Sequence, residues 1–435
     1  MHADAFVDRF HALDRFLVDH QDLWRPKPFA ELQLPWEAIY PELAAWLRAR
    51  SLADAEAVHT APHTLVAPEP FLSLAQAASA LTQVAELAGS VLHPPPERQD
   101  VAVPGRKWQQ IEAFDNKLKF RQPVQRWVDW CAGKGHLARR LTQPDAPALC
   151  LEVDQTLVST GEQLSQKVRA QVVHRQADVL QPLPVAYLGA GDTPVALHAC
   201  GDLHRQLLRV TAERECRQLA LVPCCYDRSS ADRYHPLSAI AQASPLQLER
   251  EDLRLPLCET VTGGQRVRRD RDLSMARRLG FDLLQRQVTQ RDDYLNTPPL
   301  PVHWLRQPFA AFGQELARLK GLELPRDVDW PHWEAEGFRR LAQVRNLELV
   351  RGLFRRPLEL WLVLDQALFL QQHGYSVQLG TFCAADLTPR NLMLLAEKPA
   401  LSRLSSRSRR HVCRNLGDEM KKMAFGDGLL TKSAQ

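Results

Sequence analysis

A short turn in this chain carries the residue types that bind a nucleoside cofactor. The segment VDWCAGKGHLARRL places one acid and two glycines in the spacing Asp129-x-Cys131-x-Gly133-x-Gly135. This spacing matches the pattern D-x-G-x-G-x-G, except that Cys131 stands at the first glycine. Glycine has no Cβ, so the backbone of such a turn can approach a ligand closely. We expect cofactor contacts from Asp129, Cys131, Ala132, Gly133 and Gly135.

Two further acids follow strand-like segments. Glu152 ends the run ALCLE, seventeen positions after Gly135, close to the ~20-residue spacing at which an acid meets ribose hydroxyls. Asp178 follows a third short run, VVHRQ, where a carboxylate could accept a hydrogen bond from an adenine amino group. Asp154 competes with Glu152, but its position favours a cap on the next helix. We therefore expect Glu152 and Asp178 to hold the adenosine part of the cofactor.

The next two apolar runs end in side chains that could act on a substrate. His198 could serve as a base, because the ordinary pKa of histidine lies near 6.5, or it could be a buried strand histidine. Cys224 and Cys225 could supply a nucleophilic thiolate, although most free cysteines are small buried residues. Tyr226 could stack on a base or on the adenine ring, or pack in the core. These four are the candidate catalytic residues, and His198 is also a candidate cofactor contact.

Alternating strands and helices must position these residues. Four short apolar runs predict strands at 126–131, 148–153, 194–200 and 218–224. A segment that can form a helix follows each of the first three runs, at 136–142, 156–170 and 202–213. This alternation predicts right-handed βαβ units in a parallel sheet, with ligands beyond the carboxyl ends of its strands. We expect Gly201 to permit close backbone approach there and Asp202 to cap the following helix.

The C-terminal part predicts one helix and two strands. Pro357 suits the first turn of the helix and Gly374 its C-terminal cap. A strand at 375–382, the turn DLTPRN and an antiparallel strand at 391–397 follow. A dinucleotide site also fits the glycines, because Ala138 can replace the third glycine of its pattern. The helix–strand–strand order instead is typical of methyltransferases, so we predict an α/β, Rossmann-like, seven-stranded sheet that binds S-adenosyl-L-methionine, with Asp129 on its methionine side.

Three segments fall outside this core. Apolar residues between Phe6 and Leu23 follow the helical period, and a second helix is expected with Ser73 as its cap. Residues 229–350 are polar, Arg-rich and poor in strand signal, which predicts a lid-like insert. The expected domains are 1–100, helical; 105–240, the cofactor half of the methyltransferase core; 241–352, the insert; 353–398, the remainder of the core; and 399–435, a basic tail that we expect to be mobile.

Composition excludes several classes of protein. The 435 residues are 45% hydrophobic, enough for a buried core, yet no apolar run approaches the ~18 residues of a membrane span. Acids near the start argue against a signal peptide. Nine cysteines without dense, even spacing fit a reducing cytoplasm. We expect no structural metal, because no C-x₂-C pair exists and adjacent Cys224 and Cys225 would diverge in a strand.

The paired segments LHACGDLHRQLLR and ALVPCCYDR, with YHPLS soon after, resemble class I methyltransferases that carry H-x-C-G-D-L followed by C-C-Y. GRKWQQIEAF and GYSVQLGTF…LTPRNLMLLA extend the resemblance over about 105–240 and 355–397. That group includes proteins with a glutathione-transferase-like C-terminal domain and rRNA-adenine-dimethylase-like proteins, and it is distantly similar to tRNA 2′-O-methyltransferases. The resemblance implies a methyltransferase fold with bound S-adenosyl-L-methionine, and it names no substrate.

Two basic segments favour RNA as the partner. Residues 266–286 hold seven arginines against three acids, and 403–414 hold five arginines and no acid. Such segments can neutralise phosphates, although a solvated helix face and tail would look the same. The Asn/Asp-Pro-Pro-Tyr/Phe turn of amino-methylating enzymes is absent. We therefore predict a methyltransferase acting on a hydroxyl or ring atom of RNA. The alternatives are a protein or small-molecule acceptor, or a non-catalytic cofactor-binding module.

Overall fold

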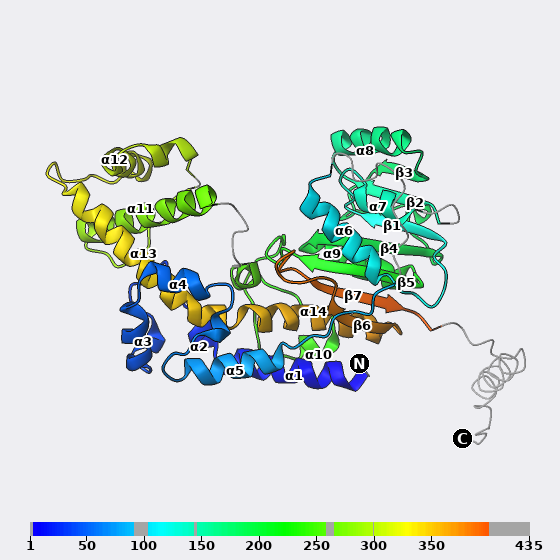
Figure 1. Ribbon diagram of the computed structural model, residues 1–435, viewed down its shortest axis with the longest axis horizontal. Helices are drawn as coiled ribbons and strands as arrows, with labels where there is room; N and C mark the ends of the chain where they lie inside the picture. Colours follow the sequence, from blue (N-terminus) through cyan, green and yellow to red (C-terminus); the bar gives the residue numbers. More distant parts are fainter. Residues whose placement is uncertain (1–2, 91–102, 143–145, 258–264, 299, 400–435) are drawn as a thin grey trace, which may run out of the picture.

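The chain forms a sheet with flanking helices at one end and a lobe of helices at the other (Figure 1). A computed structural model describes residues 3–90, 103–142, 146–257, 265–298 and 300–399. Most residues of the long helix α14 (Arg355–Gln372) are buried. The helix lies beneath the sheet and extends toward the helical lobe (Figure 1). The predicted basic segment 403–414 lies outside the described residues.

Seven strands form one mixed sheet in the order β3-β2-β1-β4-β5-β7-β6. The first five strands run parallel, and β7 pairs antiparallel with both β5 and β6. The predicted α/β methyltransferase-type sheet is confirmed, with β1 and β4 adjacent where the strand order reverses. The strands are β1 Arg126–Trp130, β2 Ala148–Glu152, β3 Val172–Gln176, β4 Asp192–Cys200, β5 Gln218–Cys224, β6 Ser376–Thr381 and β7 Leu392–Glu397.

Four further helices accompany the sheet: α6 Gly105–Lys117, α7 His136–Leu141, α8 Gln155–Lys167 and α9 Asp202–Glu213. The predicted cap of α8 is confirmed, because the Asp154 carboxylate accepts from the backbone N–H of Thr156 at 2.7 Å. Pro357 lies in the first turn of α14, and Gly374 follows that helix with φ 80°. Both ends of the core helix therefore follow the sequence signals.

The helical lobe combines two stretches that are far apart in the sequence. Helix α13 packs against α11 and also against α2, α3 and α4. This placement differs from the expected lid, because the insert buries its apolar face on the N-terminal helices and lies away from the β1–α7 turn (Figure 1). The helices outside the sheet are α1 Ala3–Asp19, α2 Gln21–Trp24, α3 Pro41–Arg48, α4 Leu52–Val58, α5 Phe71–Leu81, α10 Ala239–Gln242, α11 Gln265–Thr289, α12 Phe309–Lys320 and α13 Trp330–Gly352.

The segment around Ser73 differs from its prediction. Helix α5 begins at Phe71, so Ser73 lies inside its first turn and Pro70 occupies the capping position. The helix ends at Leu81, and the chain then runs extended beside β6, where Leu87 N–H donates to Thr381 O and Thr381 N–H donates to Ala85 O, each at 3.0 Å. The edge of the sheet thereby gains backbone partners from the N-terminal region.

A buried carboxylate explains the YHPLS segment. The Asp365 side chain on α14 accepts hydrogen bonds from the Tyr234 hydroxyl at 2.6 Å and from the backbone N–H groups of Leu237 and Ser238. All of these groups are buried, where an unpaired polar atom would be costly. This part of the family-like pattern therefore fastens the chain after β5 to the core helix.

No helix among the described residues is both long and apolar enough to span a bilayer.

Candidate functional site

The turn after β1 holds left-handed backbone. Cys131 has φ 59° and Gly133 has φ 57°, a conformation that disfavours side chains. The Ala132 N–H donates to Leu151 O at 3.0 Å, which fixes the turn to the neighbouring strand. A Cβ built at Gly133 would meet no atom within 4 Å. The wall at Gly133 is therefore open, and any larger side chain there would project into that space.

Gly135 serves a different purpose from Gly133. It adopts φ 67° at the start of α7, and a Cβ there would lie 2.5 Å from His174 Cε1 and 2.9 Å from Cys150 Sγ. Both of those neighbours are buried. Gly135 thus lets α7 pack closely on the sheet, while the open wall is formed by Cys131, Ala132 and Gly133.

A cavity of about 550 Å³ opens beside this turn. Helix α6 supplies one wall through Lys107, Gln110 and Ile111, which sequence reasoning did not select. Their spacing of i, i+3 and i+4 puts them on one helix face. This helical periodicity is the feature of the sequence that could have indicated a shared wall. The remaining lining residues are Pro104, Arg106, Asp129, Cys131, Ala132, Gly133, His136, Leu137, Leu197 and His198.

Helix α6 is tied to the turn between β6 and β7. The Arg106 guanidinium donates to the carbonyl oxygens of Leu387 at 2.8 Å and Asp386 at 2.7 Å. Gln110 Nε2 also donates to Leu387 O, at 3.1 Å. Two separate hydrogen-bonding side chains therefore hold this wall of the cavity against the C-terminal hairpin.

Asp129 is the buried acid of the cavity. Its side chain accepts from the Ala138 N–H at 3.1 Å, and only 3% of the residue is exposed. Burial raises the pKa of Asp129 to about 7, although the hydrogen bond from Ala138 and the charge of Lys107 act in the opposite direction. A cation bound nearby would favour the ionised carboxylate.

Glu152 and Asp178 lie close enough for their charges to act on Cys131, but neither is among the residues that line the cavity. Glu152 Oε2 accepts from the Gly133 N–H at 2.9 Å, so the acid at the end of β2 braces the glycine turn directly. Asp178 is exposed, and its carboxylate accepts from Leu180 N–H at 3.0 Å. Burial raises the pKa of the Cys131 thiol to about 12, and the charges of Glu152 and Asp178 add to that effect. The Cys131 thiol therefore stays protonated at neutral pH, and both acids are near enough to contribute to this.

His198 points into the cavity because β4 is irregular there. The register between β4 and β5 shifts between Leu197 and Ala199, and His198 itself has φ 65°. Such a bulge re-aims a side chain. His198 Nε2 lies 3.1 Å from Gln110 Oε1. Burial, followed by the charge of Arg390, lowers the pKa of His198 to about 4, so the ring is neutral at pH 7.

The expected divergence of Cys224 and Cys225 is wrong. Cys225 lies just beyond β5 with φ 45°, so strand alternation does not apply to it. The sulfur atoms of Cys200, Cys224 and Cys225 all lie within 4.8 Å of one another. Hydrogen bonds from the other two thiols lower the pKa of Cys225, and the charges of Arg228 and Arg390 act in the same direction. Hydrogen bonds with Cys200 and Cys225 raise the pKa of buried Cys224.

Tyr226 is unavailable for stacking on a substrate base in this structure. It is only 2% exposed and belongs to the main hydrophobic core, with its ring 5.7 Å from that of His204. The preceding residue, Cys225, has left-handed backbone, and the Tyr226 side chain that follows it lies in the core. Of the two roles considered for Tyr226, stacking on a base and packing in the core, the structure shows the second.

Backbone hydrogen bonds join the loops after β4 and β5. Gly201 N–H donates to Cys224 O, and Asp202 N–H donates to Arg228 O, both at 3.0 Å. A Cβ at Gly201 would lie 1.8 Å from Arg228 O, so the predicted close approach is confirmed. Asp202 does not cap α9; it is the first helical residue, and its carboxylate accepts from Ser230 N–H at 2.8 Å.

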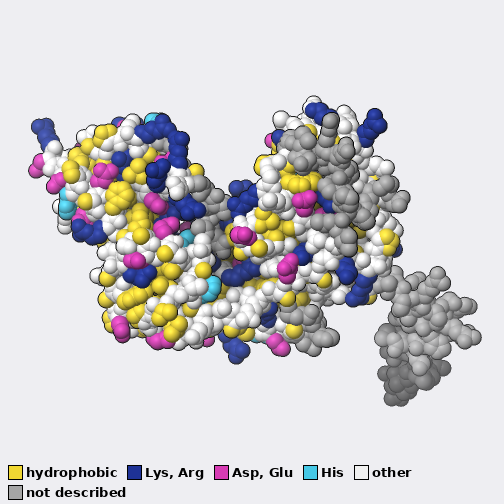
Figure 2. Space-filling model, in the orientation of Figure 1, with side chains coloured by type: hydrophobic (Ala, Val, Ile, Leu, Met, Phe, Trp, Pro, Cys, Tyr) yellow, Lys and Arg dark blue, Asp and Glu magenta, His cyan; other side chains and the backbone are white. Residues whose placement is uncertain are grey.

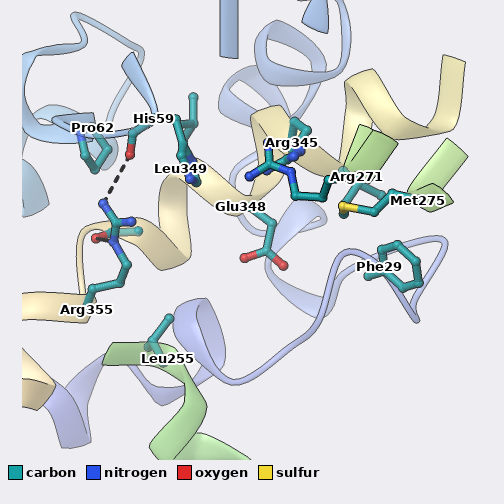
Figure 3. A pocket seen from close by; sticks show the side chains of 12 residues that line it. Phe29, His59, Pro62, Leu255, Arg271, Met275, Arg345, Glu348, Leu349 and Arg355 are labelled. Atoms are coloured by element: carbon teal, nitrogen blue, oxygen red, sulfur yellow. Dashed lines mark hydrogen bonds between the residues drawn. The ribbon is translucent and has the colours of Figure 1, made fainter. Parts of the chain in front are cut away.

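A second cavity, of about 230 Å³, lies in the helical lobe (Figure 3). Its basic side chains already have partners: Arg345 pairs with Asp272 at 2.7 Å, and Arg355 donates to His59 O at 3.1 Å. Burial and the charge of Arg355 lower the pKa of His59 to about 4. This cavity is bordered by the ion pairs that hold the lobe together.

The predicted basic helix 266–286 is partly structural. Arg277 pairs with Glu334 at 3.1 Å and Arg286 with Asp282 at 2.8 Å, and both arginines are buried. Arg278 donates to the carbonyl oxygens of Thr297 and Pro298. Most of the C-terminal half of this arginine-rich segment therefore stabilises the helical lobe. The exposed arginines lie in its first turns, at Arg266, Arg268 and Arg269.

A comparison with known protein families finds a match in the same region. Residues 106–231 match the family model described as a methyltransferase domain. Solved structures with partial likeness include PKMT2 from Rickettsia typhi in complex with AdoHcy, at 14% identity over 30% of this chain and 27% of that chain, with a TM-score of 0.20. This chain therefore matches about a quarter of the length of that protein.

Two further solved structures have similar scores. Precorrin-6y C5,15-methyltransferase from Geobacter metallireducens is 16% identical over 32% of this chain and 74% of its own, with a TM-score of 0.22. The N-terminal domain of EvdMO1 with SAH bound is 18% identical over 41% and 81%, also with a TM-score of 0.22.

The cavity fits S-adenosyl-L-methionine. Its volume lies within the ~300–1,000 Å³ range of small-molecule sites. It offers an open wall at Gly133 and the buried carboxylate of Asp129. Glu152 and Asp178 lie outside its lining and accept hydrogen bonds from backbone N–H groups near the turn. These four residues are the ones that would hold the cofactor.

Proposed function

We propose that this S-adenosyl-L-methionine-dependent methyltransferase acts on RNA, at a hydroxyl or a ring atom. When bound, the cofactor supplies a methyl group that its sulfonium has already activated. The chain's own task is then to bind and orient the acceptor, which is the main source of rate enhancement in such a reaction. In this proposal His198, at the bulge near the end of β4, receives the proton of the acceptor.

The hydrogen bond to Gln110 determines which His198 nitrogen is available. Gln110 Oε1 can only accept, so His198 Nε2 carries the hydrogen at their 3.1 Å separation. The Nδ1 lone pair is then the acceptor for a substrate hydroxyl. Because the pKa of His198 is lowered to about 4, the ring keeps this lone pair throughout the physiological pH range. His198 is a weak base and takes the proton only as the methyl group arrives.

Cationic side chains around His198 carry the proposal of an RNA acceptor. Arg390 and Lys107 are close enough to lower the pKa of His198 further by their charge. One comes from the β6–β7 turn and the other from α6, so they flank His198 from two elements. A phosphodiester backbone passing this edge would meet positive charge on both sides.

The surroundings of this edge also suit a polymeric acceptor. A cavity of about 240 Å³ is lined by Arg356, Pro389 and Asn391, on the other side of the turn that holds α6. Figure 2 shows Lys and Arg side chains on both sides of the hollow between the sheet and the helical lobe. An extended chain could contact this hollow while one nucleotide enters the site near His198.

Labelling of the acceptor tests this proposal. Total RNA and total protein from cells that lack this chain are incubated with the purified protein and methyl-labelled cofactor. We expect label in RNA and its loss in the His198→Ala variant. Label in protein alone, or in a small-molecule fraction alone, would end the RNA proposal while leaving the methyltransferase itself intact.

A further inference from the structure

Three thiols converge where β4 and β5 end. Cys200 and Cys224 are directly paired in the parallel register, and their sulfur atoms lie 3.5 Å apart. Cys225 adds a third sulfur, and all three lie within 4.8 Å of one another. No described His, Asp or Glu ligand atom joins this group. The cluster therefore contains three soft ligands of a single chemical type.

The spacing of the sulfur atoms suits a tetrahedral metal. A zinc–thiolate bond of about 2.3 Å places two ligands of one tetrahedral ion about 3.8 Å apart. The Cys200–Cys224 separation of 3.5 Å and the upper limit of 4.8 Å on the other two separations are compatible with that value. A disulfide would use two of these sulfurs and would require an approach to about 2.05 Å. The third thiol has a purpose only when all three bind one ion.

The backbone holds the cluster in place by unusual means. Cys225 has φ 45°, a strained conformation that turns its sulfur toward the other two. Gly201 N–H donates to Cys224 O at 3.0 Å, and no residue with a Cβ could replace Gly201 at its 1.8 Å approach to Arg228 O. Strain that brings three thiols together points to a purpose for the group, because separate packing cysteines would not require it.

We propose that Cys200, Cys224 and Cys225 bind one zinc ion through their thiolates, beside the cofactor cavity. Three protein ligands leave one tetrahedral position for a ligand from outside the cluster, as in zinc sites that bind water or substrate. Cys200 and Cys225 are half-buried, while Cys224 is buried. A ligand from outside the cluster would therefore approach the ion past Cys200 and Cys225. Arg228 and Arg390 offset part of the negative charge of the thiolates.

Cobalt titration tests the site without cofactor or acceptor, so its outcome is independent of the proposed RNA activity. The full chain is reduced, stripped of metal with a chelator, and titrated with Co²⁺, which has tetrahedral and thiolate-specific absorption bands. We expect one Co²⁺ per chain, displaced by one Zn²⁺. Cys200→Ser and Cys225→Ser should each lose the thiolate-to-cobalt band or weaken binding at least tenfold.

Cys383→Ser is the matched control, because Cys383 is also a half-buried free thiol and lies outside the cluster. Its cobalt spectrum should equal that of the unaltered chain. Circular dichroism of every variant checks that it is folded. Cys200 and Cys225 are both half-buried, so neither substitution changes a fully buried residue. Absence of cobalt bands in the reduced chain, an unchanged cobalt affinity and thiolate-to-cobalt band in folded Cys225→Ser, or a disulfide within the cluster after purification with reductant would each overturn the proposal.

Discussion

The cavity beside the β1–α7 turn and the cavity in the helical lobe differ in the backbone that surrounds them. At the carboxyl ends of the strands, Cys131 follows β1, His198 lies at the bulge near the end of β4, and Cys225 follows β5. All three have left-handed backbone. The cavity in the helical lobe is lined by none of the left-handed residues of the described chain. Strained backbone persists where the surrounding structure enforces it and concentrates at functional sites.

The polar groups of the two cavities differ in the same sense. In the helical lobe, Arg345 pairs with Asp272, and Arg355 donates to His59 O (Figure 3). At the sheet edge, the Asp129 carboxyl is buried with a pKa raised to about 7, so a bound cation would ionise it more readily. The charged groups of the lobe cavity pair with one another, whereas no salt bridge to Asp129 is found among the described residues; the comparison teaches that pairing, more than the presence of charge, separates the two cavities.

The largest expected effect comes from closing the open wall of the sheet-edge cavity. Gly133→Arg should abolish S-adenosyl-L-methionine binding measured by calorimetry, because a side chain there projects into the cavity. Gly321→Arg is the matched control: Gly321 also has a left-handed φ of 63° and free space around it, but it caps α12 in the helical lobe. Equal loss in both variants would show that strain, not position, explains the result.

A smaller effect is expected from the histidines of the two cavities. His198→Ala should lower the methyl-transfer rate by roughly 10²–10⁴-fold, the range for loss of a general base, while cofactor affinity stays within a factor of about three. His59→Ala is the control, because the pKa of His59 is likewise lowered to about 4. Its rate should match that of the unaltered protein. A full rate for His198→Ala would remove its role as a base.

Cofactor affinity should depend on pH through Asp129. The pKa of Asp129 is raised to about 7, so below that pH the carboxyl must release a proton to face the cofactor's ammonium group. The dissociation constant should therefore rise about tenfold for each pH unit below about 7 and stay constant above it. Calorimetry with Asp129→Asn should give weaker binding with no such slope. A slope that persists in Asp129→Asn would assign the proton to another group.

The smallest expected effect comes from restoring the glycine that Cys131 replaces. Cys131→Gly relieves a left-handed non-glycine residue, worth about 1–2 kcal/mol, but makes the unfolded chain more flexible by about 0.5–1 kcal/mol. The free energy of unfolding in urea should change by about 1 kcal/mol or less, and cofactor binding should persist. Arg169→Gly, at an exposed residue with φ 55°, is the control away from the cavity. Lost binding in Cys131→Gly alone would make the thiol a required contact.

Local signals in the sequence predicted the sheet well. Each parallel strand is a short apolar run before a turn, and the Asp154 cap and the Pro357 helix start depend only on nearby residues. The same holds for the β1 turn, whose glycines require left-handed backbone. These features could be found because their causes lie within a few residues of them.

The parts that sequence reasoning missed depend on distant partners or on backbone geometry. Nothing local in α13 indicates that it packs on α3 and α4. The thiol cluster was missed because strand alternation was extended to Cys225, whose φ of 45° ends it. Tyr226 follows that residue and turns into the core for the same reason. A bulge or a left-handed residue at a strand end thus reverses the side-chain directions that alternation predicts.

A crystal structure with S-adenosylhomocysteine tests the central claim most directly. We predict the adenosyl group along the ends of β1 and β2, with ribose oxygens within hydrogen-bond distance of Glu152 and the adenine amino group beside Asp178. Ligand bound in the helical lobe near Arg345, or a sheet-edge cavity filled by side chains with Glu152 and Asp178 directed away from the ligand, would contradict the account.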